Sequence, residues 1–501
     1  MAVEIKFCGA AGVVTGSSYL IRTSRGQFLI DCGLFQGTKT VRSLNYGDFG
    51  FAPQELGFVF LTHAHIDHSG LLPKLYKRGF AGRVYTTEAT RDLLEFMLPD
   101  SAFIQETEVR QLNQRNAKRG LPEVVPIYTH EDAETCLAHI DIVKRDEWGG
   151  FPLGVKARFW NAGHILGSAS IELKIPDDGG REVHILFSGD LGPDNKEFHP
   201  SPQSPHDLDY VVVESTYGSR QRQKTSIEDR RTRLCKEILE AGAARGNILI
   251  PAFAVERTQE LLLDIDWLTE HNRIPALPLF IDSPLATKVT SIFEKYHSEL
   301  QDLSGTSDPF KGCNIHYTQN VEESKSLNRI KSGAIIMAGS GMCDAGRIRF
   351  HLRNNLWNPA CTRSIESYSA HADQGELVSW VKSRLPVRKN IFLVHGTDES
   401  RQGMSQTLIG EGVPAATILT PLIDESFRLD TDTGGAIQLE AGRPRITPEG
   451  MAATDWHNDY ARFVLDLAEF LRGMTDSESR RALLADLTRH IGFGNRKHGS
   501  K

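Results

Sequence analysis

Hydrophobic residues follow two different patterns along most of the chain. Over about the first 200 residues, short apolar runs are broken by glycine, proline and aspartate, with helical stretches between them. From about residue 209 to 360, apolar runs alternate regularly with helical patterns. The runs are 211–213, 248–250, 279–281 and 335–337, and the helices are expected around 229–241, 257–268 and 285–296. This alternation predicts a parallel sheet covered on both faces, and therefore a second α/β unit.

A third pattern begins near residue 451. Large apolar side chains recur there at helical spacing, at Trp456, Tyr460, Phe463, Leu467 and Phe470. Thr475 and Glu478 then form a capping-box pattern ahead of a further apolar stretch. We expect two amphipathic helices packed on the body or on another subunit. Flanking acidic residues disfavour the alternative of a membrane-surface helix.

Composition narrows the class of protein. A chain of 501 residues predicts two or three domains. With 40% hydrophobic and 24% charged residues, the chain is typical of a globular protein. We expect no membrane span and no signal peptide, because no apolar run reaches membrane length and the N-terminus lacks a basic segment before a long apolar one. Seven cysteines without a C-x-x-C pattern indicate reduced thiols and a cytoplasmic protein.

The strongest chemical signal is a cluster of metal-binding residue types. His63, His65, Asp67 and His68 follow the apolar run 58–61 and precede a predicted helix. Imidazole and carboxylate groups are the usual ligands of catalytic zinc. With 18 histidines and 64 acidic residues in 501, this spacing is expected by chance in roughly three of a thousand such chains. Four ligands within six residues could serve two adjacent ions.

Other strand ends carry the same residue types. Asp31, Asp190, Glu214 and His395 each come after a predicted buried strand, and His164 lies in a glycine-rich turn. Open α/β folds place their chemistry just beyond the strands. Any one of these residues is equally well explained as a turn or capping residue. Together with the histidine cluster they supply enough ligands for two metal ions.

These residues resemble a known family. The pattern His63-x-His65-x-Asp67-His68, with His164 in A-G-H-I-L-G-S and Asp190 in F-S-G-D, looks like the metallo-β-lactamase fold. Further motifs are similar to the β-CASP ribonucleases, a group that includes RNase J and the nuclease subunit of the polyadenylation complex. They are E-S-T-Y-G from Glu214, P-A-F-A-x-x-R-x-Q-E-L-L from Pro251, D-S-P-L-A from Asp282, S-G-M-C from Ser340, S-A-H-A-D from Ser369 and L-V-H-G from Leu393.

The resemblance covers about residues 1–430 and implies an α/β architecture. We expect a four-layer αββα metallo-β-lactamase fold with an inserted parallel β-CASP domain and a C-terminal helical tail. The expected domains are 1–208 for the first part of the metallo-β-lactamase domain, 209–362 for the β-CASP domain, 363–450 for the return and 451–501 for the tail. We expect a bacterial type without a preceding KH domain. The active site would lie in the cleft between the two domains.

The resemblance also implies two zinc ions per chain. One ion would be held by His63, His65 and His164, and the other by Asp67, His68 and His395. Asp190 would bridge them, and Asp31 would orient the ligands from outside. A hydroxide shared by the ions would attack a phosphodiester, which makes Asp67 part of the catalytic set as well.

The same resemblance assigns a general acid and substrate contacts. His371 would protonate the leaving oxygen, with Glu214 as the carboxylate that keeps it protonated. A histidine at position 395 resembles the RNA-processing branch, whereas DNA-repair relatives carry an apolar residue there. Arg257, Ser340 and Arg347 are candidates for substrate binding, and for Arg347 a solvated helix face is an equal alternative.

Two features depart from the family pattern. Only Arg363 and Ser364 stand between Cys361-Thr362 and Ile365, where relatives have a further strand, a glycine-rich motif and another strand. Either the site survives with a shorter wall, or His371 is displaced and nuclease activity is weak or lost. In addition, Arg222 stands where the commoner motif T-Y-G-[DN]-R-x-H has histidine, which leaves its role open.

The sequence therefore predicts a zinc-dependent hydrolase that cleaves RNA, by endonucleolytic or exonucleolytic attack. Two alternatives stay open. One is a small-ester or lactone hydrolase on the same fold, and the other is a weakly active or non-catalytic RNA-binding subunit. The expected partner is RNA; a homodimer is an open alternative, and the sequence indicates no other protein partner. The net charge of −7 neither indicates nor excludes RNA binding, because a basic groove can lie on an acidic protein.

Overall fold

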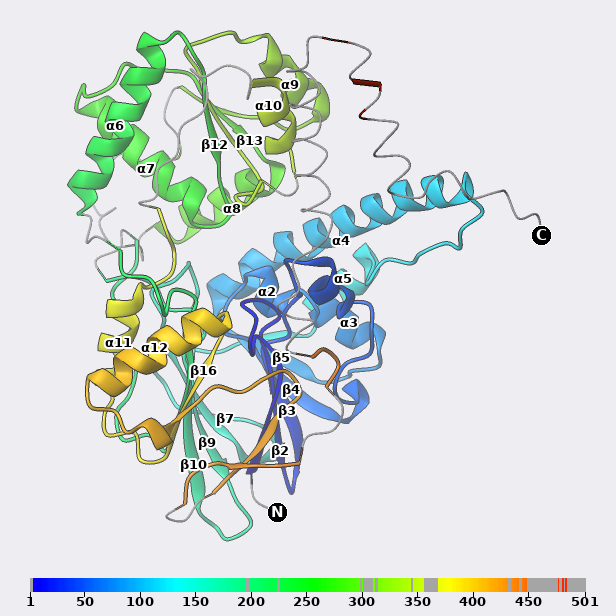
Figure 1. The fold of residues 1–501 in the computed structure, drawn as a ribbon, viewed down its shortest axis with the longest axis vertical. Helices are drawn as coiled ribbons and strands as arrows, with labels where there is room; N and C mark the ends of the chain where they lie inside the picture. The colour runs from blue at the N-terminus through cyan, green and yellow to red at the C-terminus, as the bar shows by residue number, and fades with distance from the viewer. Residues whose placement is uncertain are drawn as a thin grey trace.

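The computed structural model shows two facing sheets with a third sheet set apart from them (Figure 1). The structure describes residues 3–194, 198–222, 226–297, 300, 310, 314–343, 346–355, 368–430, 434–440, 444–447, 476, 480, 481 and 483. A search of these residues finds no helix with the length and hydropathy needed to cross a membrane.

The first sheet has eight strands in the order β19-β18-β1-β2-β3-β4-β5-β6 within the described residues. They are β1 (Val3–Gly9), β2 (Ser18–Thr23), β3 (Gly26–Ile30), β4 (Leu56–Phe60), β5 (Arg83–Thr86), β6 (Ile140–Ile142), β18 (Ser426–Leu429) and β19 (Ile437–Gln438). Strands β3 to β6 run parallel. Strand β18 pairs antiparallel with β1, so segments from both ends of the described chain complete one sheet.

The second sheet has seven strands in the order β17-β16-β11-β10-β9-β8-β7 within the described part of the chain. They are β7 (Gly149–Gly150), β8 (Lys156–Asn161), β9 (Ala169–Pro176), β10 (Glu182–Phe187), β11 (Tyr210–Glu214), β16 (Asn390–Val394) and β17 (Ile418–Leu419). Strands β10, β11 and β16 are parallel neighbours. Because the carboxyl ends of parallel strands meet at one edge, this topology brings Asp190, Glu214 and His395 together.

The two sheets face each other across an aromatic core. The rings of Phe60 and Phe159 lie 5.8 Å apart between the sheets, and those of Phe7 and Phe392 lie 5.2 Å apart. Helices α3 (Leu72–Lys77), α4 (Glu88–Ala117) and α5 (His130–Leu137) cover the outer face of the first sheet (Figure 1). Helices α11 (Gln374–Lys382) and α12 (Asp398–Gly410) cover the outer face of the second. The expected αββα layering is confirmed.

The third sheet has four parallel strands in the order β12-β15-β13-β14 among the described residues. They are β12 (Ile248–Pro251), β13 (Leu279–Asp282), β14 (Ile315–Tyr317) and β15 (Ile335–Ala338). Its helices are α6 (Ile227–Ala243), α7 (Arg257–Glu270), α8 (Pro284–Lys295), α9 (Val321–Ser326) and α10 (Ile348–Asn355). The parallel α/β unit predicted from the alternating pattern is confirmed, with α6, α7 and α8 at the predicted positions.

One strand was assigned to the wrong sheet. The sequence pattern placed the run 211–213 in the second α/β unit, but Val212 pairs in parallel with Phe187 of β10 and with Phe392 of β16. Strand β11 is buried on both faces in the middle of the seven-stranded sheet. Every central strand of a parallel sheet is a continuous apolar run, because both of its faces are buried. The hydrophobic pattern therefore does not indicate which sheet such a strand joins.

Three predictions fall outside the described residues. The tail helix with Trp456 to Phe470 and the capping pattern at Thr475 and Glu478 lie there, as does the shortened segment around Arg363 and Ser364. The domain boundaries given above stay predictions.

Candidate active site

The histidine cluster occupies the turn between β4 and α2 (Ile66–Ser69). The last three residues of β4 are buried, and the chain leaves the strand through Leu61 and Thr62, which are also buried. Helix α2 begins after His65, so Asp67 and His68 lie in its first turn. The switch from strand to a one-turn helix therefore points four polar side chains out of one short segment, at the edge where the parallel strands end.

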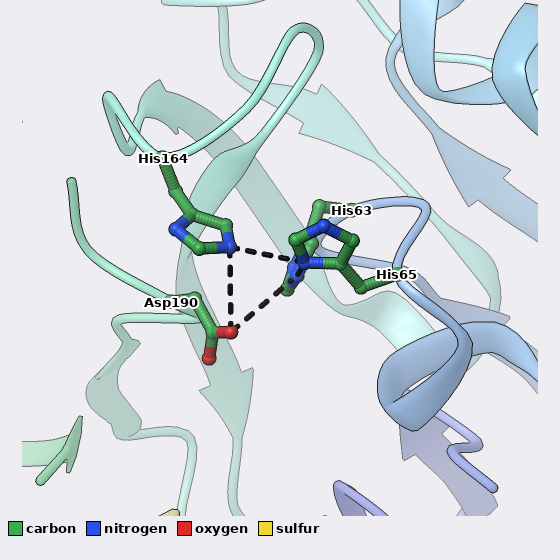
Figure 2. Close-up of side chains that lie close together, drawn as sticks. All are labelled: His63, His65, His164 and Asp190. Atoms are coloured by element: carbon green, nitrogen blue, oxygen red, sulfur yellow. Dashed lines mark hydrogen bonds and ion pairs between the residues drawn. The ribbon is translucent and has the colours of Figure 1, made fainter. Parts of the chain in front are cut away.

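The first group of candidate ligands comprises His63, His65, His164 and Asp190, which point toward one another (Figure 2). His65 Nδ1 lies 3.2 Å from His63 Nε2 and 3.0 Å from His164 Nε2. Asp190 Oδ2 lies 3.6 Å from the Nε2 atoms of both His63 and His164. His63 follows β4, and His65 directly precedes α2. His164 lies in the turn before β9, and Asp190 lies in the loop after β10.

The second group comprises Asp67, His68 and His395. The Nε2 atoms of His68 and His395 lie 3.0 Å apart, and His395 Nε2 lies 3.6 Å from Asp67 Oδ2. The other carboxylate oxygen of Asp190 faces this group, with Oδ1 lying 3.2 Å from His68 Nε2 and 3.5 Å from His395 Nε2. Asp190 therefore stands between the two groups and presents one oxygen to each.

The donor set fits metal ions. Asp190 Oδ1 is buried and has no hydrogen-bond donor in the described structure. The Nδ1 atom of His164 lies 2.8 Å from the Ala370 carbonyl, so that nitrogen carries the proton and Nε2 keeps its lone pair. Lone pairs from several imidazoles aimed at one carboxylate are the arrangement that a divalent cation requires.

Asp31 contacts the turn that carries the histidines and holds His68 and Thr62 in place. Its Oδ1 accepts from the backbone nitrogen of Thr62 at 2.8 Å, and its Oδ2 lies 2.7 Å from His68 Nδ1. The Thr62 hydroxyl donates to Asp31 Oδ2 and lies 3.0 Å from His63 Nδ1. Asp31 has φ +57°, a left-handed conformation that is uncommon outside glycine and is often found at functional sites.

Two supporting contacts were not predicted from the sequence. The Thr216 hydroxyl lies 3.0 Å from Nδ1 of His395, and the Ala370 carbonyl holds His164 as described above. Both residues lie inside quoted motifs, E-S-T-Y-G and S-A-H-A-D. A sequence pattern does not show which hydroxyl or carbonyl a distant ring will meet, so only the folded chain reveals these roles.

The carboxylates of the cluster are held in their charged form. Burial raises the pKa of Asp190, but the neighbouring His395, His68 and His371 outweigh it and hold that pKa well below its ordinary range. Burial also raises the pKa of Asp67, yet the neighbouring imidazoles of His395 and His68 bring it to about 2. Both side chains are therefore ready to act as anionic ligands at neutral pH.

The histidines of the cluster divide into two classes. Burial lowers the pKa of His63 well below its ordinary value, and the neighbouring His68 lowers it further. Burial lowers the pKa of His65 to about 4. Burial also opposes protonation of His68, but the carboxylates of Asp190 and Asp31 outweigh it and raise the pKa of His68.

His371 lies beside the cluster rather than within it. Its Nδ1 lies 3.3 Å from Glu214 Oε1, and its Nε2 lies 3.9 Å from Asp190 Oδ2. Glu214 is buried, and its Oε1 also accepts from the backbone nitrogen of Leu191 at 2.6 Å. Burial lowers the pKa of His371, but the Glu214 and Asp190 carboxylates outweigh it and raise that pKa above its ordinary value.

The loop after β11 holds the turn that carries His371. The Arg222 guanidinium donates to the His371 carbonyl, and its backbone nitrogen donates to Asp373 Oδ2 at 3.1 Å. Gln374 Nε2 donates to the Gly218 carbonyl at 2.6 Å. Arg222, whose role the sequence left open, thus contacts the backbone of the predicted general acid.

The three predicted substrate-binding residues have different surroundings. Arg257 opens α7 and makes no side-chain hydrogen bond or ion pair with any described residue. Ser340 follows β15, in the loop that packs against the segment after β12. Arg347 Nη1 donates to Asp282 Oδ1 at 2.7 Å and to Thr318 at 3.2 Å, so its charge is already paired inside the third sheet's unit.

Three descriptions of known families match the chain. They are the metallo-beta-lactamase superfamily over residues 11–227, the Beta-Casp domain over residues 258–376, and the Zn-dependent metallo-hydrolase RNA specificity domain over residues 360–418. The last of these stretches contains both His371 and His395. Along the chain, the first match covers most strands of the two facing sheets, and the second covers most of the unit built on the third sheet. The third match covers the segment that returns to the seven-stranded sheet through β16.

The chain is also similar to named proteins. It is 33% identical over 461 residues to Ribonuclease TTHA0252 of Thermus thermophilus, covering 81% of this chain and 98% of that protein. It is 30% identical over 380 residues to Probable RNase MJ4 of Methanocaldococcus jannaschii, covering 74% and 81%. It is 28% identical over 368 residues to Cleavage and polyadenylation specificity factor 73 of Drosophila melanogaster, covering 72% and 49%. With these likenesses, the chain belongs to the β-CASP family of the metallo-β-lactamase superfamily and is a metal-dependent hydrolase.

Proposed function

We propose that the chain is a ribonuclease that hydrolyses RNA phosphodiester bonds at a two-zinc centre. His63, His65 and His164 would hold one ion, Asp67, His68 and His395 the other, and Asp190 both. The observation that carries the proposal is the position of Asp190, whose two oxygens face separate groups of imidazoles. Divalent ions on such ligands supply a nucleophile at neutral pH and offset the charge of a phosphodiester.

His371 is the general acid in this proposal. Because its Nδ1 faces the Glu214 carboxylate, its Nε2 faces the cluster and can donate a proton to a leaving sugar oxygen. The carboxylates of Glu214 and Asp190 raise the pKa of His371, which favours the protonated ring. Glu214 therefore acts through His371 and holds its tautomer and its charge.

Relatives named as ribonucleases support RNA as the substrate, and so does the match to the RNA specificity domain. The guanidinium of Arg257 supports it too, because it makes no hydrogen bond or ion pair with any described residue and can donate to a phosphate. Hydrolysis of a small ester would require neither the inserted domain nor Arg257. Non-catalytic RNA binding would not require His371 to face Asp190.

The test is to load the purified chain with zinc and incubate it with end-labelled RNA, resolving the products by size. The proposal expects shortened RNA with wild-type protein, and none after a chelator removes the metal. A chromogenic lactone serves as the competing substrate. Hydrolysis of the lactone with intact RNA would favour the small-ester alternative, and RNA binding without any cleavage would favour the non-catalytic one.

A further inference from the structure

The segment between β12 and α7 contacts the turn that carries His164, one of the candidate metal ligands. It leaves β12 at the end of the third sheet that points toward the two facing sheets (Figure 1). Glu256 Oε2, in this segment, accepts from the backbone nitrogen of Leu166 at 3.2 Å. Leu166 stands two residues after His164, so this contact ties the segment to the turn that carries a candidate ligand.

The same segment is held in one conformation. Thr258 Oγ1 donates to the Phe253 carbonyl at 2.8 Å, and Gln259 Nε2 donates to the Ala254 carbonyl at 3.1 Å. Glu256 has φ +73°, and its buried carboxylate lies 2.8 Å from His199 Nε2. A left-handed glutamate persists only where the surroundings fix the backbone, so the side chains of this segment are presented in a set geometry.

Phe253 is the aromatic side chain that this segment presents. It is 42% exposed, although the backbone around it is firmly bonded. A Cβ placed on Gly341 would lie 2.6 Å from the Phe253 ring, so the backbone of Gly341 packs directly against the ring. One part of the ring is thus supported by main chain while another part stays open. A fixed, open aromatic ring is the platform on which nucleobases stack.

Arg257 lies next to this ring, and its guanidinium has no acceptor in the part of the chain that the structure describes. Its guanidinium carbon lies 6.0 Å from the centre of the Phe253 ring, and its Nε is buried without an acceptor among the described residues. A buried guanidinium nitrogen without an acceptor is costly, which favours a ligand that brings an anionic oxygen.

We propose that Phe253 is a nucleobase-stacking position of the substrate cleft, with Arg257 binding the phosphate of the same stretch of RNA. This inference rests on the proposed function and gives that site a specific contact. The ring selects for a flat aromatic base of any identity, because each base has a π-face. A side chain in place of Gly341 would displace the ring, because its Cβ would lie 2.6 Å from the ring.

The first test measures stacking without catalysis. Oligoribonucleotides that carry 2-aminopurine at successive positions are titrated with the full chain in the presence of a chelator. Wild-type protein should quench the fluorescence strongly at one position, and Phe253→Leu should abolish that quenching. Phe350→Leu is the matched control, because Phe350 is 65% exposed on α10 of the same unit. Equal quenching by Phe253→Leu and wild type would overturn the inference.

The second test measures cleavage. RNA with an abasic residue at the quenched position should raise the KM of zinc-loaded wild-type protein about tenfold relative to intact RNA. Phe253→Leu should cleave both RNAs with the same KM. The inference is overturned if the abasic residue raises the KM of Phe253→Leu as much as that of wild type. Absence of cleavage by wild-type protein would overturn the proposed function instead, and the quenching experiment would still decide the role of Phe253.

Discussion

Asp190 and Asp282 occupy similar places in two different parts of the molecule. Each is buried at the carboxyl end of a parallel strand, and each faces histidine. Asp282 accepts from Thr318, Ser324, His351 and Arg347 at 2.5 to 2.7 Å. Asp190, by contrast, has an oxygen without a hydrogen-bond donor in the described structure, between two groups of imidazoles.

The difference separates a carboxylate with a structural role from a candidate metal ligand. Buried carboxylates are normally satisfied by hydrogen bonds, and Asp282 is, so its cluster needs nothing from outside. Asp190 instead faces imidazole nitrogens with both oxygens, and a bound cation would join that carboxylate and those rings as common ligands. A buried acid beside histidine therefore favours a metal site where, as for Asp190 Oδ1, an oxygen has no hydrogen-bond partner in the described structure. The four predictions below test this comparison.

The largest effect is expected at Asp190. Replacing Asp190 with Asn should remove bound metal and lower RNA cleavage at least about a thousandfold, because one side chain serves both groups of ligands. The metal-free protein should keep most of its stability. Elemental analysis, a cleavage assay and urea unfolding check the three parts. Full metal content in this variant would remove Asp190 from the ligand set.

Asp282 should show the opposite behaviour. Asp282→Asn leaves His351 and Arg347 without their buried carboxylate, which should lower the free energy of unfolding by about 3 kcal/mol. Metal content and the turnover of the folded fraction should match wild type. Urea unfolding is the main measurement. If Asp282→Asn lost metal instead, the contrast between the two carboxylates would be wrong.

His371 should matter for rate but not for metal. His371→Ala should lower kcat about a hundredfold or more while leaving metal content unchanged, since it removes a proton donor. His130→Ala, at an exposed site on α5, is the matched control. Glu214→Gln should move the alkaline limb of the kcat profile to lower pH, because the Glu214 charge raises the pKa of His371. An unmoved limb would show that another group titrates there.

The two arginines should give the smallest effects. Arg257→Ala should raise the KM for RNA about tenfold, since its guanidinium makes no hydrogen bond or ion pair with the residues that the structure describes and can bind a phosphate. Arg347→Ala should leave KM unchanged and instead reduce the free energy of unfolding, because Arg347 is paired with Asp282. Steady-state kinetics on both variants checks this. A KM effect at Arg347 alone would reverse the assignment.

The sequence predicted which side chains lie together around Asp190 better than it predicted their surroundings. His63 to His68 stand out because their spacing is rare, and Asp190, His164 and His395 because they stand in motifs of the family. Which sheet the run 211–213 joins depends on pairing between distant strands, which a local pattern does not encode. The pairing of Arg347 with Asp282 also joins residues far apart in the sequence, so a local pattern does not encode it either.

The central claim is that Asp190 joins two groups of ligands into one two-ion centre. The most direct measurement is anomalous X-ray diffraction at the zinc absorption edge from crystals of zinc-loaded protein. The account predicts two peaks roughly 3.5–4 Å apart on either side of the Asp190 carboxylate. A single peak, or peaks away from Asp190, would contradict it.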